Sequence, residues 1–308
     1  MKPNMKNTNS PWVYLAIVFI LSFLWQLIIY FNGGIDSPLI PVTMLFPAVV
    51  AISFRIINKE GFRNVGWGLR KWWYIIPSVI APVLIVLVIG WLFTVLDWAT
   101  LSDKHFLIKE GTIEIQKIPF VLGNHEQGIT FFALNLVLSL FVQSLLGSIL
   151  TLGEEFGWRG YVQEKLIRKY GLNGGLVLLG VIWGYWHLPI GLMGWNFPEH
   201  PLLGALILTP LSTIFLGICL GWLYLRSKSI WMPALAHAAF NLSATLLFNE
   251  LIMQKDDLYL QLVFIASLGI VAGLCLLSLN RIKPQFWQKA KGLGDRKRKH
   301  FETNQPRF

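Results

Sequence analysis

Long apolar segments alternate with short polar ones along most of the chain. Eight of these segments have the length that a helix rising about 1.5 Å per residue needs to cross a hydrocarbon core about 30 Å thick. They cover residues 11–31, 38–57, 74–96, 129–152, 174–195, 202–225, 232–250 and 259–280. The pattern predicts an all-α integral membrane protein, a bundle of about eight transmembrane helices, placed in the cell membrane as a multi-pass protein.

Composition strengthens this interpretation. Of the 308 residues, 55% are hydrophobic and 14% are charged, whereas a soluble domain carries about a quarter charged residues. The segment 11–31 follows Lys2 and Lys6 and lacks a small-residue cleavage site, so we expect a retained first helix and not a signal peptide. Cys219 and Cys275 fall inside apolar segments, where we expect small buried residues that form neither a disulfide framework nor a metal site.

The basic residues are distributed unevenly over the predicted loops. With both termini in the cytoplasm, 22 of the 26 Lys and Arg residues fall in cytoplasmic segments and 4 in extracytoplasmic ones. This asymmetry predicts an N-in, C-in topology. The formal charge of +10 is therefore a topology signal. We expect the basic tail 282–308 to be disordered and close to anionic lipid, with no nucleic-acid partner.

Two loops have a character of their own. The segment 58–73 is basic and aromatic, and we expect it along the cytoplasmic interface. The extracytoplasmic connection 97–128 is the longest loop on its side, and the alternation TIEIQKI within it is compatible with a short strand or hairpin.

Polar side chains inside the spans form three clusters, and each is a functional candidate because ionisable groups are rare in lipid. The first is Glu154, Glu155 and Arg159 in GEEFGWRG. Glu155 and Arg159 are one helical turn apart and can pair, whereas Glu154 projects elsewhere and stays available as a general base. The alternative is a charged cap at the membrane boundary, held by a helix salt bridge.

The second cluster centres on His187 in GVIWGYWHLPIGL. Small residues recur with it at helical spacing, namely Gly180, Gly184 and Gly191. Such spacing marks a face where helices approach closely, so His187 should point into the bundle. Pro189 removes a backbone hydrogen bond and should kink or open the helix here. The alternative is a histidine that only bridges two helices.

The third cluster is His237 and Asn241, four residues apart in HAAFN. One helical turn places both side chains on one face, where they can direct two hydrogen-bond donors at one spot. Alone, the pair is equally compatible with polar glue between helices. Together the three clusters supply what water-mediated acyl hydrolysis requires, a carboxylate base and donors for the tetrahedral oxyanion.

These motifs resemble those of a known family. GEEFGWRGYVQEKL, GVIWGYWHLP and HAAFN are similar in order and spacing to E-E-x-x-x-R, F/W-x-x-x-H and H-x-x-x-N of the CPBP family. This is the CAAX protease and bacteriocin-processing group, also called the Abi or type II CAAX prenyl endopeptidase family. The resemblance covers roughly residues 130–250. It implies an all-helical bundle enclosing a polar cavity that is open to the cytoplasm and to the bilayer.

By this resemblance Glu154 activates the attacking water, and Glu155 and Arg159 support it.

The chain then divides into four parts. These are a variable membrane part with three helices and an extracytoplasmic loop at 1–128, a catalytic core at 129–252, a final transmembrane helix at 253–281 and the basic tail at 282–308.

The remaining motif residues also receive roles from the resemblance. His187 contacts the water or the substrate carbonyl, and His237 with Asn241 forms the oxyanion hole. The expected activity is that of an intramembrane protease acting on a membrane protein or lipidated peptide.

For this activity a metal-free mechanism is favoured. In the zinc alternative, Glu154, His187 and His237 ligate the metal around a water. The non-enzymatic alternative is a transporter or membrane scaffold with the same residues as a relay. The sequence sets no oligomeric state.

One geometric condition follows from the expected spans. Glu154 lies near the cytoplasmic end of its span, whereas His187 lies past the midplane of the next one. For the clusters to meet, the fourth span must run deeper than residue 152, or the fifth helix must begin before residue 174. A helix break is expected at GLNGG, residues 171–175.

Overall fold

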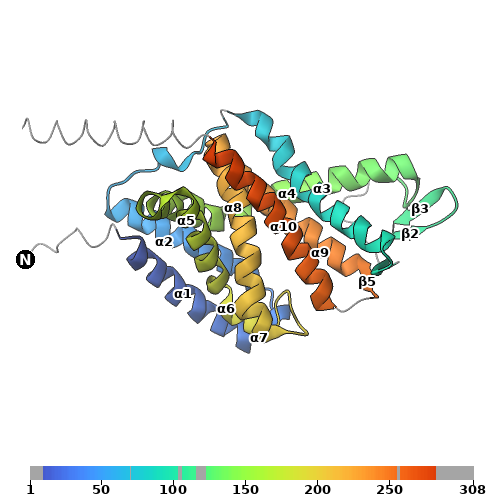
Figure 1. Ribbon diagram of the computed structural model, residues 1–308, viewed down its shortest axis with the longest axis horizontal. Helices are drawn as coiled ribbons and strands as arrows, with labels where there is room; N and C mark the ends of the chain where they lie inside the picture. The colour runs from blue at the N-terminus through green and yellow to red at the C-terminus, as the bar shows by residue number, and fades with distance from the viewer. Residues whose placement is uncertain (1–9, 70, 103–105, 116–122, 255–256, 282–308) are drawn as a thin grey trace, which may run out of the picture.

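The computed structural model describes residues 10–281 apart from 70, 103–105, 116–122 and 255–256. Helices account for most of the described chain (Figure 1). The α-helices are α1 (Pro11–Phe31), α2 (Phe46–Ile57), α3 (Ile75–Val95), α4 (Ile129–Gly157), α5 (Gln163–Trp186), α6 (Leu188–Leu192), α7 (Pro201–Leu203), α8 (Thr209–Ser227), α9 (Trp231–Glu250) and α10 (Asp257–Asn280). Short 3₁₀ segments are η1 (Gly34–Asp36), η2 (Ile40–Leu45), η3 (Arg63–Val65) and η4 (Trp72–Tyr74), and π-helical segments are η5 (Trp158–Val162) and η6 (Gly204–Leu208).

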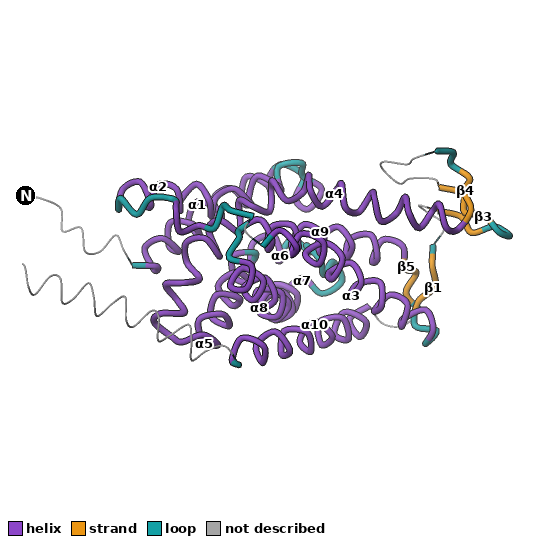
Figure 2. Tube along the Cα trace, turned by 90° about the horizontal axis from the view of Figure 1, so that it is seen from above, coloured by secondary structure: helices purple, strands orange, loops and turns teal. Residues whose placement is uncertain are grey.

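The helices pack as two groups that share the middle of the bundle. Helix α9 packs between α3 and α4, and α8 packs between α5 and α10. Helices α8 and α9 contact each other, which joins the two groups. Figure 2 shows this arrangement, with α4 and α10 on opposite sides and α8 and α9 between them. Helices α1 and α2 complete the bundle beside α4.

Helix α4 shows why this bundle suits lipid. Its buried face carries polar residues, namely Asn135, Ser139, Ser144, Ser148 and Thr151. Its outer face carries large apolar residues, among them Val137, Leu146 and Ile149. This pattern is the reverse of a soluble helix, and it is stable only where the surroundings are apolar, because exposed hydrocarbon then costs nothing and the backbone is satisfied within each helix.

One end of the bundle collects the basic loops. Ile230 N–H donates to the Gly66 carbonyl at 2.9 Å, and Lys71 Nζ donates to the Arg226 carbonyl at 2.5 Å. These bonds bind the loop after α2 to the turn between α8 and α9. We call this the basic end, which comprises residues 55–69, 71, 158–169 and 224–230. The segment 58–73 was expected along an interface, and it also enters the core there, since Val65 is fully buried.

The opposite end carries all the strands of the described residues, and we call it the strand end. Strand β1 (Ala99–Leu101) pairs antiparallel with β5 (Leu251–Met253). Strands β2 (Phe106–Ile108), β3 (Thr112–Ile115) and β4 (Glu126–Gly128) form a separate antiparallel sheet in the order β2-β3-β4. The alternation that predicted a short strand is confirmed for Thr112–Ile115, and the rest of that motif lies outside the described residues.

By length and composition, six helical segments within the described residues can cross a membrane. One of them, Ile129–Trp186, contains the expected span 129–152 and the first part of the expected span 174–195. The expected span 232–250 is helix α9, which is not among the six. The all-α membrane class is confirmed, whereas the number of crossings and the N-in, C-in orientation stay predictions.

Three helix boundaries near the polar clusters differ from those expected, and the first two satisfy the condition for the clusters to meet. Helix α4 continues to Gly157 and runs on through η5, so the fourth helix is deeper than residue 152. Helix α5 begins at Gln163 and is interrupted at Gly171, whose φ of 77° and ψ of 171° are accessible to glycine. This is the first residue of GLNGG, so the predicted break is confirmed. The expected span 174–195 also ends early, at Trp186.

Close helix contacts follow from the small residues. A Cβ added to Gly180 would lie 2.4 Å from Ile214 Cα, and one added to Gly184 would lie 2.4 Å from Pro210 Cα. Helices α5 and α8 therefore touch backbone to backbone, as the glycine spacing predicted. Nearby, Cys219 and Cys275 pack as half-buried free thiols between α8 and α10.

Replacing Gly180 by alanine should destabilise the bundle, because overpacking a tight helix contact costs about 1–3 kcal/mol. The matched control is Gly273→Ala in α10, where an added Cβ meets nothing within 4 Å and helix propensity favours alanine by about 0.5–1 kcal/mol. Thermal unfolding in detergent, followed by Trp fluorescence, should give a lower Tm for Gly180→Ala and an equal or higher Tm for Gly273→Ala. Equal Tm values for Gly180→Ala and the unmodified protein would contradict the contact.

Candidate active site

Glu155 is the centre of a buried ionic cluster at the end of α4. Arg159 Nη1 donates to Glu155 Oε1 at 2.9 Å, and His237 Nδ1 lies 3.0 Å from the same oxygen. The side chains of Glu155 and Arg159 are fully buried, and His237 is 3% exposed. The pairing of Glu155 with Arg159 that the sequence predicted is confirmed, and the same carboxylate also joins α4 to α9.

Glu154 has a different partner. Trp183 Nε1 donates to Glu154 Oε2 at 2.7 Å. The Arg159 guanidinium lies 4.7 Å from the centroid of the same indole, a cation–π contact. The His237 ring meets that indole edge to face at 5.2 Å. Trp183 therefore binds one carboxylate and packs against both groups that bind the other, so the two glutamates are held in unequal surroundings.

The end of α4 fits tightly against its neighbours. A Cβ on Gly153 would lie 2.5 Å from the Met44 carbonyl, and one on Gly157 would lie 2.5 Å from Tyr14 Oη. At Trp158 the α-helix gives way to the π-helical η5, which carries Arg159. Isolated π turns are uncommon and frequently occur at functional sites, where they change the direction of side chains. Gly153 and Gly157, which flank the two glutamates in the chain, thus allow η2 and α1 to approach the end of α4 closely.

His187 lies at the break between α5 and α6. Its Nδ1 is 2.9 Å from the Trp183 carbonyl, and since a carbonyl can only accept, this nitrogen carries the proton. The ring packs edge to face on Trp186 with the centroids 4.7 Å apart. The helix opening expected beside Pro189 is confirmed, because His187 has non-helical backbone angles between the two helices.

Gln26 of α1 spans this break, and the sequence interpretation missed it. Its Nε2 donates to the Trp186 carbonyl at 3.2 Å, and its Oε1 accepts from the Ile190 N–H at 3.0 Å. In an unbroken helix these two backbone groups, four residues apart, would bond to each other. Gln26 is 1% exposed. An amide within an otherwise apolar span was the available signal, because buried polar groups in lipid require partners.

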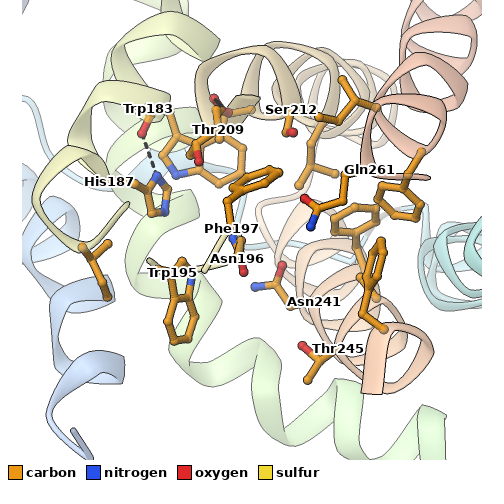
Figure 3. Close-up of a pocket in the computed structure, with 18 of the residues that line it drawn as sticks. Trp183, His187, Trp195, Asn196, Phe197, Thr209, Ser212, Asn241, Thr245 and Gln261 are labelled. Atoms are coloured by element: carbon orange, nitrogen blue, oxygen red, sulfur yellow. Dashed lines mark hydrogen bonds between the residues drawn. The ribbon is translucent and has the colours of Figure 1, made fainter. Parts of the chain in front are cut away.

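The three clusters meet around one cavity of about 700 Å³. Its lining includes Glu154, His187, His237 and Asn241. Figure 3 shows His187 on one wall and Asn241 on the opposite one, with the bond from His187 to Trp183 dashed. Glu155 and Arg159 lie behind the lining as the buried support described above. All six predicted site residues are therefore close in space, although their chemical roles stay predictions.

The zinc alternative was tested against the side chains that are present. The described part of the chain contains no group of three His, Cys, Asp or Glu side chains that could hold a metal ion. A zinc site formed by Glu154, His187 and His237 is therefore not supported by the described side chains.

Two comparisons with known proteins agree with the motifs. Residues 129–243 match the family model described as Type II CAAX prenyl endopeptidase Rce1-like. A CAAX prenyl protease 2 of Methanococcus maripaludis is 32% identical over 99 residues, which cover 30% of this chain and 36% of that protein. The match therefore spans about a third of the length of this curated relative. The matched residues 129–243 contain all three polar clusters, and the resemblance noted from the motifs is confirmed.

Replacing Gln26 by leucine should destabilise the protein, because it leaves the Trp186 carbonyl and the Ile190 N–H buried without partners, at about 1–3 kcal/mol for each group. Gln143→Leu is the matched control, since Gln143 Nε2 donates to Ser139 within its own helix. We expect a clear drop in Tm for Gln26→Leu and a small change for Gln143→Leu. If the two variants unfold at the same temperature, Gln26 does not hold the break.

Proposed function

We propose, from the membership of residues 129–243 in the type II CAAX prenyl endopeptidase family, that the protein is an intramembrane endopeptidase in which Glu154 activates water. The observation that supports this proposal is the difference in surroundings between two adjacent carboxylates. Glu155 is bonded to Arg159 and His237, whereas Glu154 lines the cavity. Substrates are membrane-associated or lipidated proteins, in keeping with the names of the family model and the relative.

The first chemical step uses Glu154. Its Oε2 accepts from Trp183, so Oε1 is left to take a proton from a water molecule. The water oxygen attacks the peptide carbonyl carbon and forms a tetrahedral intermediate. His187 donates through Nδ1 to backbone, so Nε2 of the neutral ring is an acceptor that helps to hold the water. Glu154 then passes the proton to the amide nitrogen as the C–N bond breaks.

The second requirement is stabilisation of the oxyanion. Asn241 supplies a neutral donor through its amide. His237 already uses Nδ1–H toward Glu155, so its Nε2 donates only when the ring is an imidazolium. An imidazolium with Arg159 would balance the two carboxylates, which leaves a buried cluster without net charge. Buried charges are tolerated when they are compensated in this way, and the Glu155 carboxylate is placed to stabilise the imidazolium.

Replacing Glu154 by glutamine should nearly abolish proteolysis, because a general base contributes about 10²–10⁴-fold. Glu164→Gln is the matched control, since Glu164 is an exposed residue paired with Arg168 on the surface. The measurement is cleavage of a quenched fluorescent peptide library by purified protein, followed by a proteomic search for membrane peptides that accumulate in cells carrying Glu154→Gln. Substantial activity in Glu154→Gln would remove this residue from the mechanism.

The same assay separates the two hydrolytic mechanisms. Exhaustive chelation should leave cleavage unchanged, because the mechanism proposed requires only side chains and water. Loss of activity on chelation that zinc restores would favour the metal-dependent alternative instead.

Removing an oxyanion donor should lower the rate by about 10²–10³-fold. We expect this for His237→Ala and for Asn241→Ala, with Tm measured to exclude unfolding. Ser267→Ala is the control, because its hydroxyl donates to the Val263 carbonyl of its own helix α10. An Asn241→Ala enzyme as fast as Ser267→Ala would show that this amide does not act on the oxyanion.

A further inference from the structure

Three cationic side chains gather at the basic end, and none of them lines the cavity of the proposed active site. Lys71 Nζ donates to the Arg226 carbonyl at 2.5 Å. A Cβ placed on Gly66, in the same segment as Lys71, would lie 2.8 Å from the Lys228 carbonyl oxygen. The segment after α2 thus packs on the turn that follows α8, and it brings Lys71 against the chain that carries Arg226 and Lys228.

These charges are poorly compensated by the protein. Among the described residues, neither Lys71 nor Arg226 forms an ion pair with a carboxylate. Glu164 acts on Lys228 from α5, but its carboxylate is already bound to Arg168 at 2.6 Å. Partial burial lowers the pKa of Lys228, Glu164 raises it, and the charge of Lys71 lowers it again. Lys71 and Lys228 therefore repel each other, and an anion bound by both would relieve that repulsion.

The donors that remain suit a phosphate group. Lys71 Nζ uses one N–H for the Arg226 carbonyl, and an ammonium group has three. The Arg226 guanidinium lies 6.0 Å from the Trp222 centroid, at the outer limit of a cation–π contact. Its buried Nε has no hydrogen-bond partner within the described part of the chain. A guanidinium presents its N–H groups as a planar fork that can bind two phosphate oxygens at once. The cluster therefore combines one such fork with two ammonium groups.

The surroundings place this cluster at the depth of lipid headgroups. Trp72 and Trp73 follow Lys71 directly and are 63% and 55% exposed. Exposed Trp side chains favour the boundary between membrane and water. One helical segment that can cross a membrane begins at Trp72 and another ends at Ser227. Lys71 and Lys228 thus lie just outside the hydrocarbon-spanning segments, where the phosphate groups belong to phospholipids.

We propose that Lys71, Arg226 and Lys228 form a binding site for the headgroup of an anionic phospholipid. One phosphate group binds the Arg226 fork and the two ammonium groups, and it compensates charges that the chain leaves unpaired. The acyl chains lie along the start of α3, where Ile76 is 61% exposed. Such a lipid joins the segment after α2 to the turn before α9, and it stabilises the fold whether or not the protein is a protease.

Lipid binding to the intact protein tests this site. The full-length protein in a neutral detergent is titrated with phosphatidylglycerol or with phosphatidylcholine, which carries a phosphate group but no net charge. Native mass spectrometry counts the bound lipids and gives Kd, and Trp fluorescence gives Tm. We expect tighter binding of phosphatidylglycerol and a higher Tm in its presence. Equal affinity for the two lipids would overturn the inference.

A matched pair of lysines separates a defined site from general attraction to a basic surface. Lys228 and Lys59 are exposed residues of the same end with left-handed backbone angles, at φ of 59° and 54°, a conformation that asparagine adopts readily. Lys228→Asn should weaken phosphatidylglycerol binding about fivefold, the effect of one basic residue at a membrane surface. Lys59→Asn should leave it nearly unchanged. Equal weakening by both variants would show diffuse attraction and no site.

Stability without lipid distinguishes a ligand site from a structural role. Lys228→Asn removes the repulsion from Lys71. In detergent alone its Tm should therefore equal or exceed that of the unmodified protein, whereas the increase in Tm on adding phosphatidylglycerol should be smaller. A lower Tm for Lys228→Asn in detergent alone, together with an unchanged lipid affinity, would assign Lys228 to the fold and remove it from the site.

The nature of the anion is tested with two other probes. Inorganic phosphate or a Glu-rich peptide is added to the lipid-free protein in place of phosphatidylglycerol. Neither should raise Tm at concentrations at which the lipid does. Phosphate that is as effective as the lipid would make this a site for free anions. A peptide that binds and that phosphatidylglycerol does not displace would make it a protein-docking surface. Either result would overturn the assignment to a lipid.

Discussion

The contact on which the rest of the site depends is the Glu155 carboxylate, which is shared between the side chains of Arg159 and His237. Glu155 Oε1 accepts from Arg159 and from His237, and all three side chains are almost completely buried. Removing one partner from a buried ion pair typically costs about 3–5 kcal/mol, because the remaining charge loses its compensation. The end of α4, the π-helical η5 and α9 are therefore fixed together, and Glu154 takes its place relative to His237 from this bond.

The rest of the site is assembled around a broken helix. The opening at His187 exposes backbone groups that lipid cannot satisfy, and Gln26 from α1 supplies both missing partners. Trp183, one turn earlier, then connects the break to the ionic cluster, since it binds Glu154 through its indole and His187 through its carbonyl. The Trp186 carbonyl and the Ile190 N–H thus both have a partner, and the break can present His187 to the cavity.

Local signals in the sequence were sufficient for much of this arrangement, and long-range contacts were not. The pairing of Glu155 with Arg159 and the break at Gly171 depend on neighbours along one helix, so spacing predicted them. The close approach of α5 to α8 at Gly180 was predicted from the spacing of glycines along α5 alone. Hydropathy ended the fourth span at residue 152 because it counts Glu154 and Glu155 as charges. In the structure Glu155 is paired with Arg159, and the helix continues past both glutamates to Gly157. Gln26 meets Trp186 across 160 residues, and the pairing of β1 with β5 joins distant segments, so no local pattern contains them.

The basic end gives the site one closed wall. There the loop containing Gly66 is hydrogen-bonded to Ile230, and Val65 of the same loop is fully buried and lies 3.2 Å from a Cβ placed on Gly160. The resemblance implied an opening to the cytoplasm and to the bilayer, and the side of the membrane that this end faces stays a prediction. Because Glu155, Arg159 and His237 are buried together, their charges are compensated by one another. The carboxylate left for chemistry is therefore the one that lines the cavity, Glu154.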